Sequence, residues 1–514
     1  MALSFLLLLL LLLLFVFMLL YFALHFLPKL RSRSQGKVPP NPPPVPILGN
    51  LWLIKSFSQL GHVLRHLKAA YGPIVTVYIG RRPAIFIMDR TFAHRSLVQK
   101  GVAFSHRPPP LSTSRALGAN VHTINMAAYG PHWRLLRRAL SSYVFHPSHL
   151  GLQADARAWA LDALLQELIS EAEAGGGIVQ LSERLLFSGF RLFTLLCFGD
   201  KLEEEIIKSI RDALMGSLKI AVMLRVYNLL PNLALLVFWR RLIKFLRIRQ
   251  QLDDLFVPLI RVRQQQRQSQ REPSLSRSSS YVDTLLEFRH VDQGGRELSE
   301  EEIVGLCSEF LTASAETTST GVEWIMANLV KHQDIQEKLW TEIESVMCAT
   351  QRATVEEEDI RRMPYLKAVV LEGLRRHPPV HLLLPHMVAE ETVLDGYVIP
   401  RGAIVNCSVA EIGRDGKVWS EPWEFRPERF LAGGEGEGVD LTGSKEIKMM
   451  PFGAGKRMCP GMGISVLLLE YFVANLVRKF RWKGLAGEEV DLSEKPGLAV
   501  GMKNPFRARI VGRN

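Results

Sequence analysis

The chain has 514 residues with a formal net charge of +12, and 47% of its residues are hydrophobic. A positive charge of this size would suit nucleic acid, an anionic membrane surface or an acidic protein, but no nucleic-acid-binding motif is present, so we expect no nucleic-acid partner. The five cysteines are odd in number and widely spaced, which excludes a disulfide framework or a Cys-x-x-Cys zinc pair and favours a reducing compartment.

The N-terminal segment from Leu3 to Leu24 is apolar apart from Ser4 and is long enough to cross about 30 Å of hydrocarbon as a helix. A cleaved signal peptide is disfavoured, because no basic residue precedes the apolar segment and no small-residue cleavage site follows it. The basic residues that follow indicate that this side of the membrane is cytosolic. We therefore expect a transmembrane anchor at residues 1–28, a basic and proline-rich hinge at 29–50 and a catalytic domain at 51–514.

The first part of this domain should contain a β-hairpin and a basic helix. Apolar and β-branched segments at Ile74 to Ile79 and Ala84 to Met88 are separated by a turn with glycine and proline, which predicts two paired strands. Pro131 stands at a favourable first helical position, and the helix it begins places Trp133 and Arg137 four residues apart on one face. On its own, this spacing is also typical of a solvated basic helix with one packed tryptophan.

Two later segments differ in composition from their neighbours. The segment from Leu218 to Arg249 is unusually apolar and basic, which fits either a core helix or a surface that dips into the bilayer and meets anionic head groups. The segment from Gln264 to Ser280 is polar and low in complexity, so we expect a mobile loop within one domain.

A long helix should follow. Ser299-Glu-Glu-Glu302 forms a capping box, from which a helix is predicted to continue to about Lys331. Near its middle, the segment 313–320 concentrates hydroxyl side chains that compete for backbone hydrogen bonds, so we expect the helix to bend or open there. In this segment Glu316 and Thr317 place an acid beside a hydroxyl, a pair that can relay protons. The alternative interpretation is an exposed face rich in serine and threonine.

A helix is also predicted from Tyr365 to His377, where two prolines follow. Glu372 and Arg375 are three residues apart on one face of it, and such a pair is by default a surface pair worth well under about 1 kcal/mol. Arg429, further along the chain, offers a second guanidinium to the same carboxylate.

The segment from Pro451 to Gly461 places Cys459 in a setting that suits a metal-bound thiolate. Gly453 and Gly455 remove side chains from a tight turn and would let the backbone approach a flat ligand closely. The alternative is that Cys459 is a small buried side chain with no ligand.

The apolar spacing from Ile464 to Phe480 predicts a helix that begins just after this cysteine. Its N-terminal amides and dipole would favour the thiolate form, and Lys456 and Arg457 should lower the cysteine pKa in the same direction.

The pattern Phe-x-x-Gly-x-Arg-x-Cys-x-Gly in this segment resembles the haem-binding loop of the cytochrome P450 family. The resemblance extends in order over nearly the whole chain, through the Trp-x-x-x-Arg, Glu-x-x-Arg and Pro-Glu-Arg-Phe motifs. It implies the cytochrome P450 fold, mainly α with a small β region, and a haem b cofactor with Cys459 as the metal ligand. Segments such as Trp324 to Val330 resemble plant A-type microsomal members, in particular family eighty-nine.

The same resemblance implies roles for individual residues. It assigns cofactor contacts to Cys459, Phe452, Arg457, Trp133, Arg137 and His386, the last three at the haem propionates. Glu316 would be the catalytic acid and Thr317 the hydroxyl that stabilises bound oxygen. Ser314 stands where the family usually has glycine, and its extra bulk could affect the efficiency or type of oxygen chemistry. Glu372, Arg375 and Arg429 would form a buried structural triad.

The function implied is a haem-thiolate monooxygenase that inserts one atom of dioxygen into a small hydrophobic plant metabolite. No Gly-rich dinucleotide-binding motif is present, so electrons from NADPH should arrive through a separate cytochrome P450 reductase. A cationic face would receive it, formed by Lys445, Lys448, Lys456 and Arg457. The expected location is the endoplasmic reticulum membrane, with a single span and a cytosolic catalytic domain.

Two other functions stay open: a redox-independent haem-thiolate isomerase or dehydratase, and a non-catalytic haem sensor. Retention of the acid and threonine pair argues against the sensor. By resemblance, the pocket walls should come from residues 104–125, 309–316, 380–384 and 498–502. These segments are mostly apolar, with Asn125 and His381 as polar contacts, which indicates a hydrophobic substrate with few anchoring groups.

Overall fold

The computed structural model describes residues 12–13, 15–17, 37–45, 49–50, 53, 60–80, 82–109, 123–146, 151, 153–223, 239–269, 280–290, 294–350, 352–497 and 499–513. The predicted anchor at 1–28 and the basic part of the hinge at 29–50 lie almost wholly outside these ranges. Within them, no helix combines enough length and apolar character to cross a membrane.

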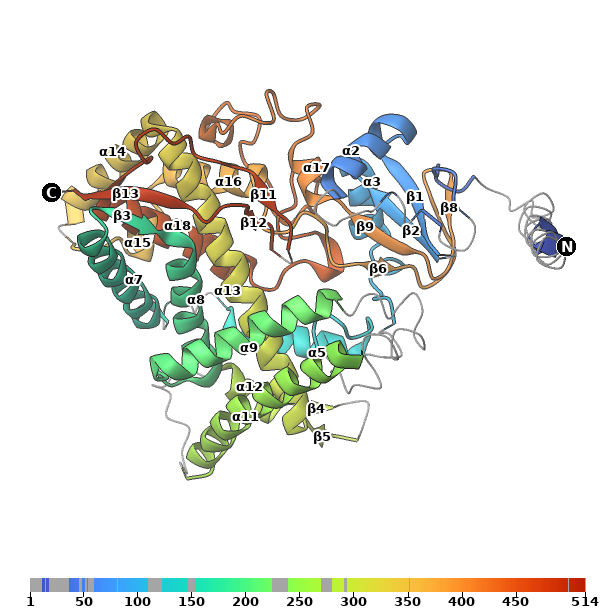
Figure 1. Ribbon diagram of the computed structural model, residues 1–514, viewed down its shortest axis with the longest axis horizontal. Coiled ribbons are helices and arrows are strands. Elements are labelled where there is room, and N and C mark those ends of the chain that lie inside the picture. The colour runs from blue at the N-terminus through green and yellow to red at the C-terminus, as the bar shows by residue number, and fades with distance from the viewer. Residues whose placement is uncertain are drawn as a thin grey trace, which may run out of the picture.

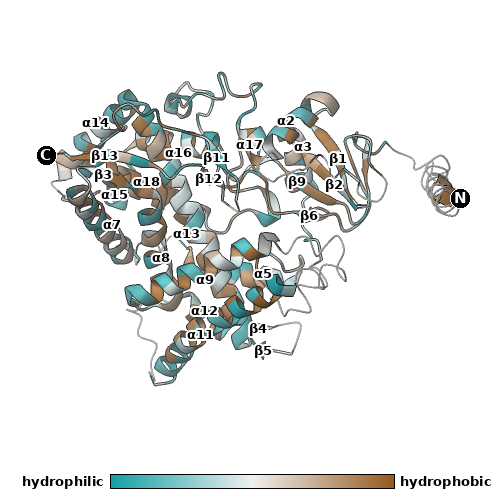
Figure 2. Ribbon diagram, viewed as in Figure 1, coloured by the Kyte–Doolittle hydropathy of each residue, from teal (hydrophilic) through white to brown (hydrophobic). Residues whose placement is uncertain are grey.

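A four-stranded sheet stands at the N-terminal end of the molecule, with strand order β1-β2-β9-β6 (Figure 1). β1 (Ile74–Ile79) pairs antiparallel with β2 (Arg82–Ile87), which runs parallel to β9 (Ile404–Cys407), and β6 (His386–Met387) forms the far edge. The predicted hairpin is confirmed, although β2 begins two residues earlier than expected. β1 and β2 are largely apolar (Figure 2), as strands packed against a core should be.

The remaining strands form small sheets. β3 (Ile178–Gln180), β10 (Phe480–Lys483) and β13 (Arg507–Gly512) make a three-stranded sheet of order β10-β13-β3. The two-stranded pairs are β4 (Arg289–His290) with β5 (Arg296–Glu297), β7 (Thr392–Leu394) with β8 (Tyr397–Ile399), and β11 (Glu494–Lys495) with β12 (Gly501–Met502).

Helices make up most of the described chain. In order they are α2 (Leu60–Tyr71), α3 (Arg90–His94), α5 (Pro131–Ala139), α7 (Ala154–Ala174), α8 (Leu181–Phe198), α9 (Glu204–Met223), α11 (Trp239–Ser269), α12 (Tyr281–Glu287), α13 (Glu300–Lys331), α14 (Gln333–Thr350), α15 (Glu357–Ile360), α16 (Pro364–Arg376), α17 (Val409–Gly413) and α18 (Met462–Lys479). Short π-helical turns follow α3 and α5, at η3 (Arg95–Gln99) and η4 (Leu140–Val144), and 3-10 turns occur at η7 (Pro427–Phe430) and η8 (Gly455–Arg457).

The long helix α13 passes through the centre of the molecule (Figure 1). It begins at the predicted capping box, because the Ser299 hydroxyl accepts from the Glu302 amide and the Glu302 carboxylate accepts from the Ser299 amide. A Cβ added at Gly321 would lie 2.8 Å from Leu469 Cδ2, so glycine allows α13 to approach α18 closely. The apolar residues of α8, α13, α16 and α18 form one core.

Two expectations about helices need correction. The α13 helix continues through residues 313–320, so it does not open there, and the hydroxyls of Thr317 and Ser319 donate to carbonyls of the preceding turn. The segment expected to be a loop from Gln264 begins as helix, since α11 extends to Ser269; residues 270–279 lie outside the described ranges. Much of the apolar and basic segment 218–249 also lies outside them.

Candidate active site

The segment that carries Cys459 closes on itself just before α18. The Cys459 amide donates to the Phe452 carbonyl at 2.8 Å, and the Phe452 side chain packs against the main apolar core. Gly461 caps α18, whose first residue is Met462. The predicted position of the cysteine just before a helix N-terminus is therefore confirmed.

Glycine is required at position 455 by a contact that the sequence did not indicate. Gly455 has φ +71°, and a Cβ there would lie 1.9 Å from the Leu97 carbonyl oxygen in η3. Gly453 also has a positive φ of +72°, but its Cβ would meet Leu383 Cδ2 only at 3.4 Å. At Gly455 the backbone approaches η3 closely, and the approach of this turn to a flat ligand stays a prediction.

The expected cause of thiolate formation is wrong in part. Burial raises the pKa of the Cys459 thiol, while the Gly461 amide and the Arg137 guanidinium act in the opposite direction. The cation that lowers this pKa is Arg137 on α5, not Lys456 or Arg457. Arg137 also donates to the Met458 carbonyl next to the cysteine. A bound metal would favour the thiolate further, because a metal deprotonates a coordinating thiol.

Trp133 and Arg457 converge on one stretch of backbone. Trp133 Nε1 donates to the Ile124 carbonyl at 3.0 Å, and Arg457 Nη1 donates to the same oxygen at 3.1 Å. Arg457 Nη2 reaches the Ala127 carbonyl at 2.7 Å, and its guanidinium lies 4.5 Å from the centroid of the Trp133 ring. Arg457 therefore points into the protein and is removed from the expected cationic docking face.

His386 lies at the sheet edge on β6, buried, with Nδ1 2.6 Å from the Phe104 carbonyl. A carbonyl only accepts, so Nδ1 carries the proton, and in the neutral ring Nε2 is then an acceptor. Burial lowers the pKa of His386 to about 3, with Arg107 acting in the same direction. His386 can donate to a carboxylate through Nε2 only if that carboxylate itself stabilises the imidazolium.

Glu316 and Thr317 are half-buried on α13. Thr317 Oγ1 donates to the Ala313 carbonyl at 2.7 Å. One carboxylate oxygen of Glu316, Oε2, is buried and has no hydrogen-bond partner among the described residues. Burial raises the pKa of Glu316, and the backbone of Ala499 opposes that shift. Glu316 therefore holds a proton more readily than an exposed glutamate does.

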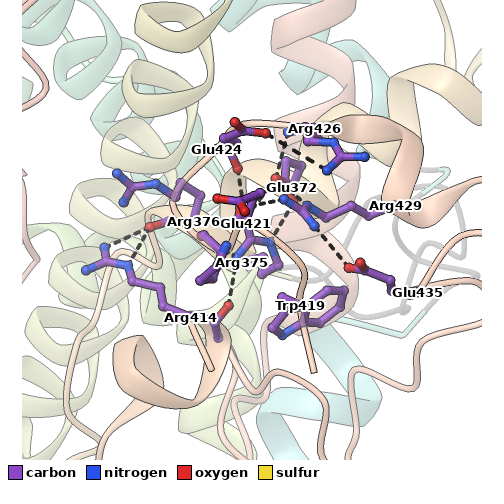
Figure 3. A network of polar contacts seen from close by, with 12 residues as sticks. Glu372, Arg375, Arg376, Arg414, Trp419, Glu421, Glu424, Arg426, Arg429 and Glu435 are labelled. Atoms are coloured by element: carbon purple, nitrogen blue, oxygen red, sulfur yellow. Dashed lines mark hydrogen bonds and ion pairs between the residues drawn. The ribbon is translucent and has the colours of Figure 1, made fainter. Parts of the chain in front are cut away.

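The predicted triad is present and buried (Figure 3). Arg375 Nε and Nη2 donate to Glu372 at 2.6 and 2.8 Å, and Arg429 Nε donates at 3.3 Å. The Arg426 amide adds a fourth donor at 2.8 Å. The default reading as a surface pair is thus wrong, and the triad ties α16 to η7 behind the site.

Comparison with known proteins identifies the family. The family model for cytochrome P450 matches residues 39–507. The chain belongs to the cytochrome P450 family. It is 43% identical to cytochrome P450 89A9 of Arabidopsis thaliana over 95% of this chain and 96% of that protein. It is 30% identical to a flavonoid 3'-monooxygenase of Crocosmia x crocosmiiflora over 96% of each chain. A zebrafish cytochrome P450 solved with abiraterone matches with a TM-score of 0.71 at 24% identity, over 88% of this chain and 100% of that one, and has the same fold.

These matches support the predicted place in the plant family eighty-nine. The protein is a cytochrome P450 monooxygenase, and its cofactor is haem b.

The residues around Cys459 fit haem b, which carries two propionate groups. Burial, together with the neighbouring Arg107 and Arg137 guanidiniums, lowers the pKa of Arg457 to about 9, so three cations share one region. Glu309 is the carboxylate that acts on both Arg107 and Arg457. One carboxylate does not neutralise three guanidiniums, and two further carboxylates would complete the charge balance.

The sequence predicted Glu309 and Arg107 only as parts of the pocket walls and gave neither of them a role in the cofactor region. Glu309 accepts from the Ile124 and Asn125 amides at 2.8 Å each, and Arg107 Nε donates to the Asn125 carbonyl at 2.9 Å. Glu309 precedes Ala313 by four residues and Thr317 by eight, so the three share one face of α13. That spacing is the signal that could have found it.

The residues expected to contact the substrate or the reductase include some that bind other protein groups. His381 lies 3.6 Å from the carboxylate of Glu494, and burial lowers its pKa to about 4. Among the expected docking residues Lys445 and Lys456 are exposed, whereas the Lys448 ammonium donates to the Glu435 carbonyl at 2.9 Å.

Proposed function

We propose that this cytochrome P450 inserts one atom of dioxygen into a small hydrophobic plant metabolite, with electrons from NADPH delivered by cytochrome P450 reductase. Bound haem supplies the redox-active iron, and thiolate ligation by Cys459 favours O–O cleavage. Arg137 and Arg457 would hold the propionates, with Phe452 beside the cysteine loop and His386 as a further propionate contact. Trp133 was expected to contact a propionate as well, but its single N–H donates to the Ile124 carbonyl, so its ring would support Arg457 instead. On α13, Glu316 would be the acid that supplies protons, and the Thr317 hydroxyl would stabilise bound oxygen.

The observation that carries the proposal is the Glu316 carboxyl group. A half-buried acid with one unpartnered oxygen and a raised pKa holds a proton more readily than an exposed glutamate and can pass it on, which is what proton delivery to an oxygen site requires. The Thr317 hydroxyl uses its proton for the Ala313 carbonyl, and its oxygen stays available as an acceptor. Ser314 is half-buried on the same helix, two residues before Glu316. Its side chain, where the family usually has glycine, would reduce the space beside Glu316 and Thr317.

The proposed location is the endoplasmic reticulum membrane, with residues 1–28 as a single span and the catalytic domain in the cytosol. Membrane lipid would also meet the start of α11, where Trp239 is 52% exposed and arginines follow at 240 and 241. The substrate walls expected from the sequence are mostly apolar. Flavonoids, terpenoids and other plant lipids and phenolics are therefore the compounds to screen by substrate-induced spectral shifts.

Thr317→Val tests the role of the hydroxyl, because valine has nearly the same shape and no oxygen. With reductase and NADPH, the fraction of NADPH electrons released as hydrogen peroxide should rise several-fold, since oxygen is no longer stabilised. Glu316→Gln should slow NADPH consumption itself, because glutamine cannot transfer a proton.

The matched control is Thr318→Val, at the adjacent buried hydroxyl, whose oxygen has no hydrogen-bond partner among the described residues. This variant should behave as the wild type does. Equal peroxide release from Thr317→Val and wild type would contradict the assignment.

The two rival functions predict different NADPH use. An isomerase or dehydratase would turn over a hydroperoxide with no NADPH, and a sensor would bind gas with no turnover. NADPH consumption that requires reductase and slows in Glu316→Gln would exclude both.

A further inference from the structure

One peptide group connects α13 to the two side chains that line the cofactor region. The amide of Asn125 donates to Glu309 Oε1 at 2.8 Å. The carbonyl of the same peptide group, on Ile124, accepts from Trp133 Nε1 at 3.0 Å and from Arg457 Nη1 at 3.1 Å. A carboxylate on one side and a guanidinium on the other polarise this peptide in the same sense, which strengthens both hydrogen bonds.

The second oxygen of Glu309 is also used. Oε2 accepts from the Ile124 amide at 2.8 Å, and the Thr123 side chain adds a further hydrogen bond to the carboxylate. Burial raises the pKa of Glu309 to about 6, while these donors and Arg107 oppose the shift. A buried carboxylate that keeps this many donors fixes the backbone it binds.

The same stretch of backbone is attached to the sheet as well. Arg107 Nε donates to the Asn125 carbonyl at 2.9 Å. Arg107 Nη1 donates to the backbone carbonyls of Leu384 and Pro385 at 2.8 and 2.9 Å. His386, at the start of β6, follows directly. Residues 123–127 thus join three parts of the site: α13, the Trp133 and Arg457 pair, and β6.

We propose that Glu309 is a positioning residue, which sets Arg457 for the haem propionates by holding the Ile124–Asn125 peptide group. Trp133, whose single N–H also binds this peptide group, packs beside the Arg457 guanidinium, and each Nη atom of Arg457 keeps a second N–H for a propionate. This inference rests on the proposed cofactor contact of Arg457. Glu309 itself acts through the backbone, and it also supplies negative charge to a cluster of three guanidiniums.

Glu309→Gln tests this role with little change in shape. Glutamine keeps one acceptor oxygen, but its NH2 group would face one of the two backbone amides, so one hydrogen bond becomes a repulsive contact. Amide hydrogen exchange in a peptide that covers residues 123–127 should become faster. Transfer of haem from the full-length protein to an excess of an apo-haem acceptor should become about tenfold faster, the size expected for loss of one hydrogen bond to a charged group.

Glu323→Gln is the matched control. Glu323 is a buried carboxylate on the same helix with a raised pKa, and it accepts from the Ser182 hydroxyl and the Phe506 amide, with no contact to residues 123–127. It should leave both the exchange at residues 123–127 and the haem transfer rate unchanged. If Glu309→Gln does not fold, Glu309→Asp keeps the charge but shortens the side chain, and it supplies the same two measurements.

Unchanged exchange at residues 123–127 in the Glu309 variant would overturn the inference, as would equal acceleration of haem transfer by both glutamine variants. The exchange measurement does not use activity. If the wild-type protein failed to consume NADPH, the proposed function would fail while the exchange result still decided the role of Glu309.

Discussion

Gly455→Ala tests whether the cysteine loop depends on contact with η3. The position has φ +71°, and an alanine in this left-handed region costs about 1–2 kcal/mol. Its Cβ would also lie 1.9 Å from the Leu97 carbonyl, so main chain must move, and overpacking of this kind typically costs about 1–3 kcal/mol. We therefore expect a loss of stability of about 2–5 kcal/mol, a large part of the about 5–15 kcal/mol that folded proteins have.

The assay compares unfolding midpoints in urea and haem content after purification. Gly463→Ala is the control, because that glycine is in α18, four residues after Cys459, and an added Cβ would meet nothing within 4 Å. Alanine there should be neutral or stabilise the helix by about 0.5–1 kcal/mol. Equal stability and equal haem content in the two variants would refute the role given to the η3 contact.

Three further predictions concern buried and surface charges. Burial raises the pKa of Glu470 from 4.5 to about 7, although the charge of Lys367 opposes this shift. The folded state therefore binds the proton more tightly than the unfolded state, and the free energy of unfolding should fall by about 3 kcal/mol as the pH rises from 4.5 to 7. Glu470→Gln lacks this loss, and its urea midpoint relative to wild type should rise between pH 5 and pH 8; a constant difference would contradict it. Glu372→Gln removes the charge of a buried carboxylate paired with Arg375 and should lower the free energy of unfolding by about 3–5 kcal/mol. Glu489→Gln, in the exposed ion pair with Lys331, should lower it by under about 1 kcal/mol. Lys445→Glu should reduce turnover with reductase and leave peroxide-driven turnover intact; equal loss in both assays would remove the docking proposal.

Local signals in the sequence predict much of the fold. The Ser299 capping box locates the start of α13, proline at 131 locates the start of α5, and a segment of apolar and β-branched residues locates β1. Each of these signals depends on residues only a few positions apart, so it can be recognised in the sequence without knowledge of tertiary contacts. The segment at 313–320 shows the limit of such reasoning, because packing of α13 in the core keeps helical a sequence with poor helix propensity.

The predictions about the site fail where partners are far apart in the chain. Arg457 was expected to act on Cys459, two residues away, but it donates to carbonyls of Ile124 and Ala127, more than 300 positions earlier. The sequence predicts Glu309 only as the edge of a pocket wall, because its spacing from Ala313 and Thr317 indicates a shared helix face but not the two backbone amides that it binds. Residue types near the cysteine identify the chemistry, whereas the positions of the charges depend on tertiary contacts.

The central claim is that the Cys459 sulfur is the protein ligand of a haem iron. The most direct measurement is the absorption spectrum of the reduced carbon monoxide adduct, for wild type and for Cys459→Ser, each supplied with excess haem. We predict that the wild type shows the Soret band of thiolate ligation and that the serine variant loses it. A colourless wild-type protein, or the same band in the serine variant, would contradict the claim.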